Sequence, residues 1–256
     1  MTVQSRIDSL ATGSGEGCFS QVSRVQLVQG LRERVANPDS LYQGVASLCG
    51  PTSLIHCLLR DNAEAYVGYV VDLWTTGRGR IGTLNVRPGE DCRNATPRGI
   101  AAVDWVALAS LRDSENTILD YDEPADQVAG ITMPGTLAAW FRAAGYQDVR
   151  NVTNVWFTKG ESDINTATAL LRQGKRVCLF INADLVQHGA SGGGRTTVPD
   201  HWVELVACNG IRDGRVRGAV LWTWARRWPL PDLTVEQFCG NFFGYVAGRY
   251  GAPPAR

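Results

Sequence analysis

The stretch YQGVASLCGPTSLIHCLL, residues 42–59, decides the interpretation of this chain. Cys49 stands directly before Gly-Pro-Thr-Ser and an apolar run whose spacing predicts a helix. Pro51 suits the first turn of that helix, because an N–H group would have no intrahelical partner there. A helix N-terminus stabilises a thiolate through its dipole and its unpaired N–H groups. The stretch therefore predicts Cys49 as a nucleophile, and the alternative is a small buried residue where a helix starts.

Apolar periodicity divides the chain into a helical part and a strand-rich part. Helical spacing comes first, and Pro134 and Gly145 stand where the last of these helices would begin and end. The predicted helices cover residues 25–36, 51–59, 63–74, 99–111 and 132–145. Strand-like runs follow at 149–157, 176–182, 201–209 and 217–225, with helices at 163–174 and 234–244.

This order predicts an α+β fold in which a helical half, about residues 25–146, packs on an antiparallel sheet half, about residues 147–256. We expect the active-site cleft between the two halves. Residues 1–24 are expected to be a flexible segment, which leaves 25–256 as a single catalytic domain. Asn-Gly and Asp-Gly pairs within residues 209–216 predict that the strands on either side are hairpin neighbours.

The composition excludes several classes of function. Hydrophobic residues make up 44% of the 256 and charged residues 20%, as in a protein that folds alone. Lys plus Arg and Asp plus Glu both total 25, so no net charge favours nucleic acid as a partner. The seven cysteines are an odd number and include no CxxC pair, which argues against a disulfide framework and a structural zinc site. No HExxH motif is present either, so we expect no metal and no cofactor.

The start of the chain has no apolar core of the length that a cleavable signal peptide needs, and no later run is long enough to span a membrane. We therefore expect synthesis in the cytoplasm without a cleavable signal. Export through a secretion system that is independent of such a signal stays open.

A base for the thiol has to come from three histidines, His56, His188 and His201. His56 lies on the predicted helix of Cys49, where packing or capping is the expected role. His188 adjoins a glycine-rich loop, which favours exposure to solvent. His201 opens a predicted strand about 150 residues after the cysteine, an order that fits a Cys-His pair. We therefore predict His201 as the base.

Gln43-Gly44 before Cys49, together with the later His201, resembles the papain-like cysteine peptidase superfamily. CGPTS and DHWVEL are closest to the C39-like and bacterial papain-fold toxin or effector branch. The resemblance implies that the Gln43 amide and the Cys49 N–H form an oxyanion hole. It also implies a third catalytic member in LWTWAR, where Thr223 and Trp224 stand without an Asn or Asp. The chain would therefore use a dyad, or a triad completed by Thr223.

The same resemblance implies contacts to substrate from Gly44, Gly50, Trp202 and Trp224. Its implied activity is hydrolysis of a peptide, isopeptide or side-chain amide through a thioester, with a host or competitor-cell protein as a candidate target. Deamidation and acyl transfer use the same chemistry, and a catalytically silent protein-binding domain is a further alternative. Asp200 would orient His201 only through a bulge, because neighbouring strand residues point to opposite faces. The loop at residues 189–200 is either a flap over the substrate or an ordinary surface loop.

Overall fold

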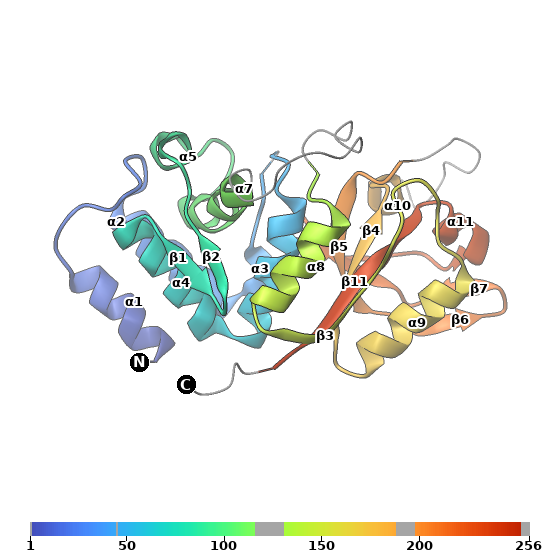
Figure 1. The fold of residues 1–256 in the computed structure, drawn as a ribbon. Coiled ribbons are helices and arrows are strands. Elements are labelled where there is room, and N and C mark those ends of the chain that lie inside the picture. The colour runs from blue at the N-terminus through green and yellow to red at the C-terminus, as the bar shows by residue number, and fades with distance from the viewer. Residues whose placement is uncertain (1, 45, 116–130, 188–197, 252–256) are drawn as a thin grey trace. The chain divides into compact units, whose positions relative to one another are not determined.

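The computed structural model describes residues 2–44, 46–115, 131–187 and 198–251 (Figure 1). These residues form two compact units, Met1–Thr132 and Met133–Arg256. The structure is a mixed α+β arrangement with antiparallel sheets, as the sequence predicts. The division falls before the helix at Pro134, which the sequence analysis assigned to the helical half.

The first unit is mainly helical. Its helices are α1 (Val3–Thr12), α2 (Arg24–Ala36), η1 (Pro38–Ser40), α3 (Cys49–Asp61), α4 (Ala63–Thr76), α5 (Glu90–Asn94), α6 (Ala102–Asp104), η2 (Trp105–Ala109) and α7 (Ser110–Glu115). A short antiparallel hairpin joins β1 (Gly79–Ile81) to β2 (Leu84–Val86). Local signals set several boundaries: Ser23 and Gln26 form a capping box on α2, and Gly77 ends α4 with a φ of 69°.

Part of the N-terminal segment that we expected to be flexible is ordered. The Thr2 hydroxyl accepts a hydrogen bond from Ser5 N and caps α1. Ile7 and Leu10 of α1 are buried, and so is Phe19 in the stretch that follows. Burial of these apolar side chains supplies the stabilisation that a short isolated helix lacks in water.

The second unit is built on a six-stranded antiparallel sheet in the order β3-β11-β4-β5-β8-β9. These strands are β3 (Tyr146–Thr153), β4 (Arg176–Ile181), β5 (His201–Ala207), β8 (Val220–Thr223), β9 (Arg226–Pro229) and β11 (Phe242–Tyr250). A smaller sheet joins β6 (Gly210–Arg212), β7 (Arg215–Arg217) and β10 (Leu233–Thr234). The helices are α8 (Pro134–Ala143), α9 (Glu161–Arg172), α10 (Asp184–Gln187) and α11 (Val235–Cys239).

Alternation along the strands builds the core of this unit. Val177, Leu179 and Ile181 of β4 belong to one apolar cluster, which also takes in the buried residues of α9. The residues between them point to the other face, where Phe180 stacks on Trp202 with ring centroids 4.5 Å apart. Both faces of the central strands are therefore buried, which fixes their register.

Two parts of the second unit differ from the sequence prediction. The helix expected over residues 234–244 ends at Cys239, and the chain continues as β11, which lies between β3 and β4 (Figure 1). The predicted hairpin strands β5 and β8 do pair, but their connection folds into a second hairpin, β6–β7. Its turn contains Asp213 and Gly214, both with positive φ, which is the geometry that Asp-Gly favours.

Among the described residues, a search for helices long and apolar enough to cross a bilayer found none.

Candidate active site

Cys49 is the first residue of α3, as predicted, and its side chain is buried. Leu48 occupies the N-cap position and makes no side-chain capping bond, so the first N–H groups of α3 receive no cap from that side chain. The helix start therefore offers the partial positive charge that favours a thiolate. All seven cysteines are present as thiols.

The Gln43 side chain is held close to the start of α3 by one backbone carbonyl. Gln43 Nε2 donates to the carbonyl oxygen of Ala46 at 3.3 Å, and the same oxygen accepts the N–H of Leu48 at 2.8 Å. The Gln43 side chain is only 6% exposed, and its Oε1 has no hydrogen-bond partner in the described part of the chain. Burying an amide whose oxygen has no hydrogen bond costs free energy, so packing alone does not explain this arrangement.

A buried ion pair fixes the backbone just before Gln43. Arg34 of α2 makes a two-pronged contact to Asp104 of α6, with Nε at 2.9 Å from Oδ1 and Nη2 at 2.7 Å from Oδ2. Asp104 Oδ2 also accepts the N–H of Tyr42 at 3.1 Å. Asp104 is fully buried, so the contact anchors the loop from inside the unit. The sequence analysis missed this pair, because its partners lie far apart in the chain and no local motif marks them.

The two glycines near Cys49 allow close backbone contacts. Gly44 has a φ of 66°, and a Cβ at that position would lie 2.9 Å from the carbonyl oxygen of Gly99. A Cβ on Gly50 would lie 2.4 Å from the Cβ of Thr132. Both positions therefore require glycine for packing, and their contacts to substrate stay predictions.

His201 is the first residue of β5, and its ring is enclosed by two residues from the end of β8. Its Nε2 lies 2.8 Å from the Thr223 hydroxyl oxygen. The Trp224 ring stacks on the imidazole, with centroids 4.7 Å apart and an interplanar angle of 19°. The resemblance implied Thr223 as a candidate third catalytic member, and that role stays a prediction. Because Nε2 faces Thr223, Nδ1 is the ring atom left for proton transfer.

Burial controls the protonation of His201. The side chain is 4% exposed, and removal from water lowers the pKa of its imidazole to about 4. The ring is therefore neutral at pH 7, in the form that accepts a proton. Proton transfer from Cys49 to His201 stays a prediction.

The turn between β8 and β9 holds Trp224 in an unusual backbone conformation. Trp224 and Ala225 have φ values of 49° and 59°, and Thr223 pairs with Arg226 across this two-residue turn. Asn-Gly is the common choice for such a turn, because side chains with a Cβ adopt positive φ at a cost. Trp228 packs edge-on against Trp224 at 5.8 Å and bonds the carbonyl oxygen of Thr223 through Nε1. These contacts hold the tryptophan over the imidazole.

The remaining candidates have other neighbours. Asp200 Oδ1 accepts the N–H of Ala183 at 2.7 Å, and burial raises the pKa of this carboxyl. Trp202 is 1% exposed and stacks on Phe180, which gives it a packing role, and its contact to substrate stays a prediction. His56 Nε2 lies 3.0 Å from Asp39 Oδ1, which agrees with the structural role expected for it. His188 and most of the loop at 189–200 lie outside the described residues.

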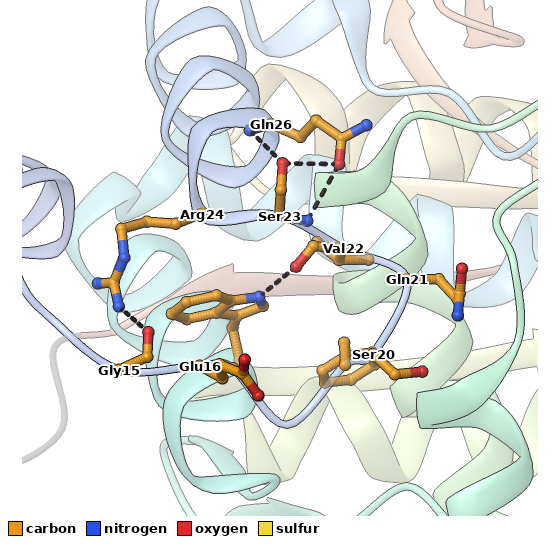
Figure 2. A pocket seen from close by; sticks show the side chains of 11 residues that line it. Gly15, Glu16, Ser20, Gln21, Val22, Ser23, Arg24 and Gln26 are labelled. Atoms are coloured by element: carbon orange, nitrogen blue, oxygen red, sulfur yellow. Dashed lines mark hydrogen bonds between the residues drawn. The ribbon is translucent and has the colours of Figure 1, made fainter.

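A pocket in the first unit contains none of the predicted site residues. It is lined by residues 15–17, 19–24, 26 and 74 (Figure 2). The Trp74 indole N–H donates to the carbonyl oxygen of Val22 at 2.9 Å, and Arg24 bonds the carbonyl oxygens of Leu10 and Gly15. The side-chain donors of Trp74 and Arg24 at this pocket therefore bind backbone carbonyl oxygens. Within the described ranges, no cluster of three or more His, Cys, Asp or Glu side chains could hold a metal ion.

Comparisons with family models, with curated proteins and with solved structures found no match.

Proposed function

We propose that the chain is a papain-like cysteine hydrolase in which Cys49 attacks an amide carbonyl and His201 is the base. Gln43 and the Cys49 N–H stabilise the oxyanion, and Thr223 orients the imidazole. The observation that carries the proposal is the setting of His201, a buried neutral imidazole with Nε2 against the Thr223 hydroxyl at 2.8 Å and one face on Trp224. These two neighbours fix the orientation of the ring, as a base that serves one particular thiol requires.

The first step transfers a proton and forms a bond. His201 Nδ1 takes the proton from the Cys49 thiol, and the sulfur attacks the carbonyl carbon of the substrate. The carbonyl oxygen becomes an oxyanion, which accepts hydrogen bonds from the Cys49 N–H and the Gln43 amide. The step requires Nδ1 to come within hydrogen-bonding reach of the sulfur.

The later steps return both groups to their starting state. The imidazolium gives its proton to the departing amine as the carbon–nitrogen bond breaks, which leaves a thioester on Cys49. Water then attacks the thioester with His201 again as base, and the acid product leaves with the thiol reprotonated. Burial lowers the pKa of the imidazole, so the imidazolium gives up its proton more readily than free histidine does, which favours protonation of the departing amine.

The Gln43 NH₂ group gives the oxyanion role further support. It carries two N–H donors and makes one long bond of 3.3 Å to the Ala46 oxygen. An oxyanion can accept a hydrogen bond from the second N–H. Gln43→Glu keeps the shape and removes the donor, so we expect it to lower kcat by about 100-fold with little change in KM.

The test uses the thiol itself. Iodoacetamide at pH 7 should alkylate Cys49 at least tenfold faster than the partly exposed Cys18, as measured by peptide mass spectrometry. His201→Gln should bring the rate for Cys49 down to that of Cys18. Cys49→Ala should abolish hydrolysis of amide substrates, while Cys18→Ala should leave it unchanged. A Cys49 that reacts no faster than Cys18, with or without His201, would refute the proposal.

The proposed substrate is a polypeptide, cleaved at a peptide, isopeptide or side-chain amide bond. Mass spectrometry of proteins from host or competitor cells, treated with wild-type or Cys49→Ala protein, separates the outcomes. New termini indicate peptide hydrolysis. A gain of about one mass unit without cleavage indicates deamidation, and an adduct indicates acyl transfer. A target outside the producing cell would require export.

One observation favours a second candidate, a silent domain that binds a protein partner. Thr223 offers His201 an uncharged hydroxyl, which stabilises an imidazolium less than a carboxylate would. In that case Cys49→Ser should keep both partner binding and the biological effect, whereas a hydrolase should lose the effect.

A further inference from the structure

Trp156 and Phe157 form the largest exposed aromatic pair in the described residues. Their side chains are 74% and 71% exposed, and they lie side by side in the turn between β3 and α9. Single exposed apolar residues are common on protein surfaces, but two consecutive exposed aromatic residues leave more apolar area in water than one residue does. Exposed apolar patches mark interaction surfaces, and aromatic side chains supply much of the binding energy there.

The turn that carries the two rings is ordered by its own hydrogen bonds. Asn154 Oδ1 accepts the N–H groups of Trp156 and Phe157 at 2.7 and 2.9 Å. The N–H groups of Asn154 and Lys159 bond to carbonyl oxygens at the start of β11, at 2.8 and 2.7 Å. The rings are thus presented on a fixed backbone, and binding to them costs less conformational entropy than binding to a loose loop.

Strand register places this turn at the same end of the sheet as His201. Thr153 pairs with Gly244, Phe242 pairs with Ile181, and Ile181 pairs with His201. The turn and the imidazole are therefore separated by three strand spacings, roughly 15 Å across the sheet. Val198, which is 58% exposed, lies at the same end, where its carbonyl oxygen accepts the Asn182 side-chain N–H at 2.8 Å.

The strand that leads into the turn favours a polypeptide as the occupant. β3 is the edge of the sheet, and its residues from Arg150 to Thr153 pair with β11 on one side only. An edge of this kind presents N–H and C=O groups that an extended peptide can pair with. The opposite edge, β9, is short and contains Pro229, which blocks such pairing. Glu161 and Asp163 in the first turn of α9 disfavour an anionic membrane near the rings.

We propose that the Trp156–Phe157 turn and the adjoining edge of β3 dock an extended apolar segment of the polypeptide substrate, at the end of the sheet that carries His201. The inference rests on the proposed function and adds the substrate class. A substrate paired along β3 leaves the strand at the Trp156–Phe157 turn, and the chain beyond the turn has to cover roughly 15 Å to reach the imidazole. The aromatic turn therefore raises affinity for long chains and contributes nothing to small amides.

The test separates docking from chemistry by using the full chain with Cys49→Ala. The probe is fluorescein-labelled β-casein, a polypeptide without a stable fold, and its binding is followed by anisotropy. Trp156→Ser with Phe157→Ser should weaken binding at least about tenfold. The matched control is Val25→Ser, which removes an exposed apolar side chain, 75% exposed, from α2 in the first unit and should leave binding unchanged.

Four results would overturn the inference. The double variant could bind β-casein as well as its parent does, or Val25→Ser could lose as much β-casein binding as the double variant. The double variant could also lose binding to phosphatidylcholine–phosphatidylserine vesicles while it keeps β-casein binding, or it could abolish a dimer that the parent forms in sedimentation. Failure of the proposed function is distinguished in a second set of proteins that retain Cys49, by the rate at which iodoacetamide alkylates that thiol. That rate depends on the thiol and His201, and the double variant should leave it unchanged.

Discussion

Gln43 and His201 are almost equally buried, at 6% and 4% exposure, yet their side chains differ in how many of their polar atoms have partners. His201 has Nε2 against a hydroxyl and a ring face against an indole. Gln43 has one long bond and a buried oxygen without a hydrogen-bond partner in the described residues. The comparison teaches that His201, the proposed base, is oriented by contacts within its own unit, while the Gln43 amide makes one long hydrogen bond and keeps an acceptor oxygen without a partner in the described residues.

The first prediction removes the carboxylate of Asp104, which anchors the loop that carries Gln43. Asp104→Ala leaves the buried Arg34 with Glu33 as its remaining acidic partner and deprives the Tyr42 N–H of its acceptor, so we expect a loss of about 3 kcal/mol in the free energy of unfolding. Urea denaturation measures it. Asp72→Ala removes the solvent-accessible partner of Arg6 and should change the midpoint little. Similar losses in both variants would show that Asp104 has no special structural role.

The second prediction concerns the pH dependence that burial of His201 imposes. The folded pKa of about 4 lies below the ordinary value of 6.5, so the unfolded chain binds the proton first as pH falls. Stability from this group is complete above pH 6.5 and declines by about 3 kcal/mol as pH falls to 4, at about 1.4 kcal/mol per pH unit. Urea denaturation across this range should show the decline in wild type and a smaller one in His201→Gln. Parallel curves for the two proteins would assign the decline to other groups.

The third prediction tests packing where Cys49 joins α3. Gly50→Ala places a Cβ against the Thr132 side chain, and we expect overpacking to cost about 1–3 kcal/mol in the free energy of unfolding. Thr132→Gly in the same chain removes the opposing atoms and should recover part of the loss. Thermal denaturation of the single and double variants measures this coupling, and additive losses would contradict the contact.

The smallest effect is expected from the hydroxyl that faces His201. Thr223→Val keeps the shape and removes the hydrogen bond, which should cost about 1 kcal/mol of stability. If the imidazole loses its orientation, kcat should fall about tenfold with KM unchanged. Thr223→Ser retains the hydroxyl and should keep most of the activity. A Thr223→Val enzyme with wild-type kcat would remove Thr223 from the site.

The sequence predicted the elements that have a strong local signal. The helix that starts at Cys49 follows from its apolar spacing, and the strand that starts at His201 follows from alternation. β11 was missed because FFGYVAGRY is buried along most of its length and resembles a continuation of the preceding helix. The Arg34–Asp104 pair was missed for a different reason: its partners are brought together by tertiary packing, which leaves no periodic trace in the chain.

Within the site, residue types were easier to predict than contacts. That β5 and β8 are neighbours followed from the turn signals between them, whereas the contact between His201 and Thr223 depends on side-chain directions that the turn signals do not give. The stack of Trp224 on the imidazole depends on two successive residues with positive φ, Trp224 and Ala225. The sequence does not predict this conformation, because neither residue is the Asn or Gly that usually adopts it. Such a local conflict between preference and conformation is typical of functional positions.

The Trp224–Ala225 turn also sets a limit for engineering. Replacing these two residues by Asn-Gly would relieve the backbone and is a substitution that a search for thermostable variants would select. The same change would uncover one face of the imidazole and admit water to it, so its pKa would rise toward that of free histidine. Selection for heat resistance alone is therefore expected to raise the pKa of the His201 imidazole.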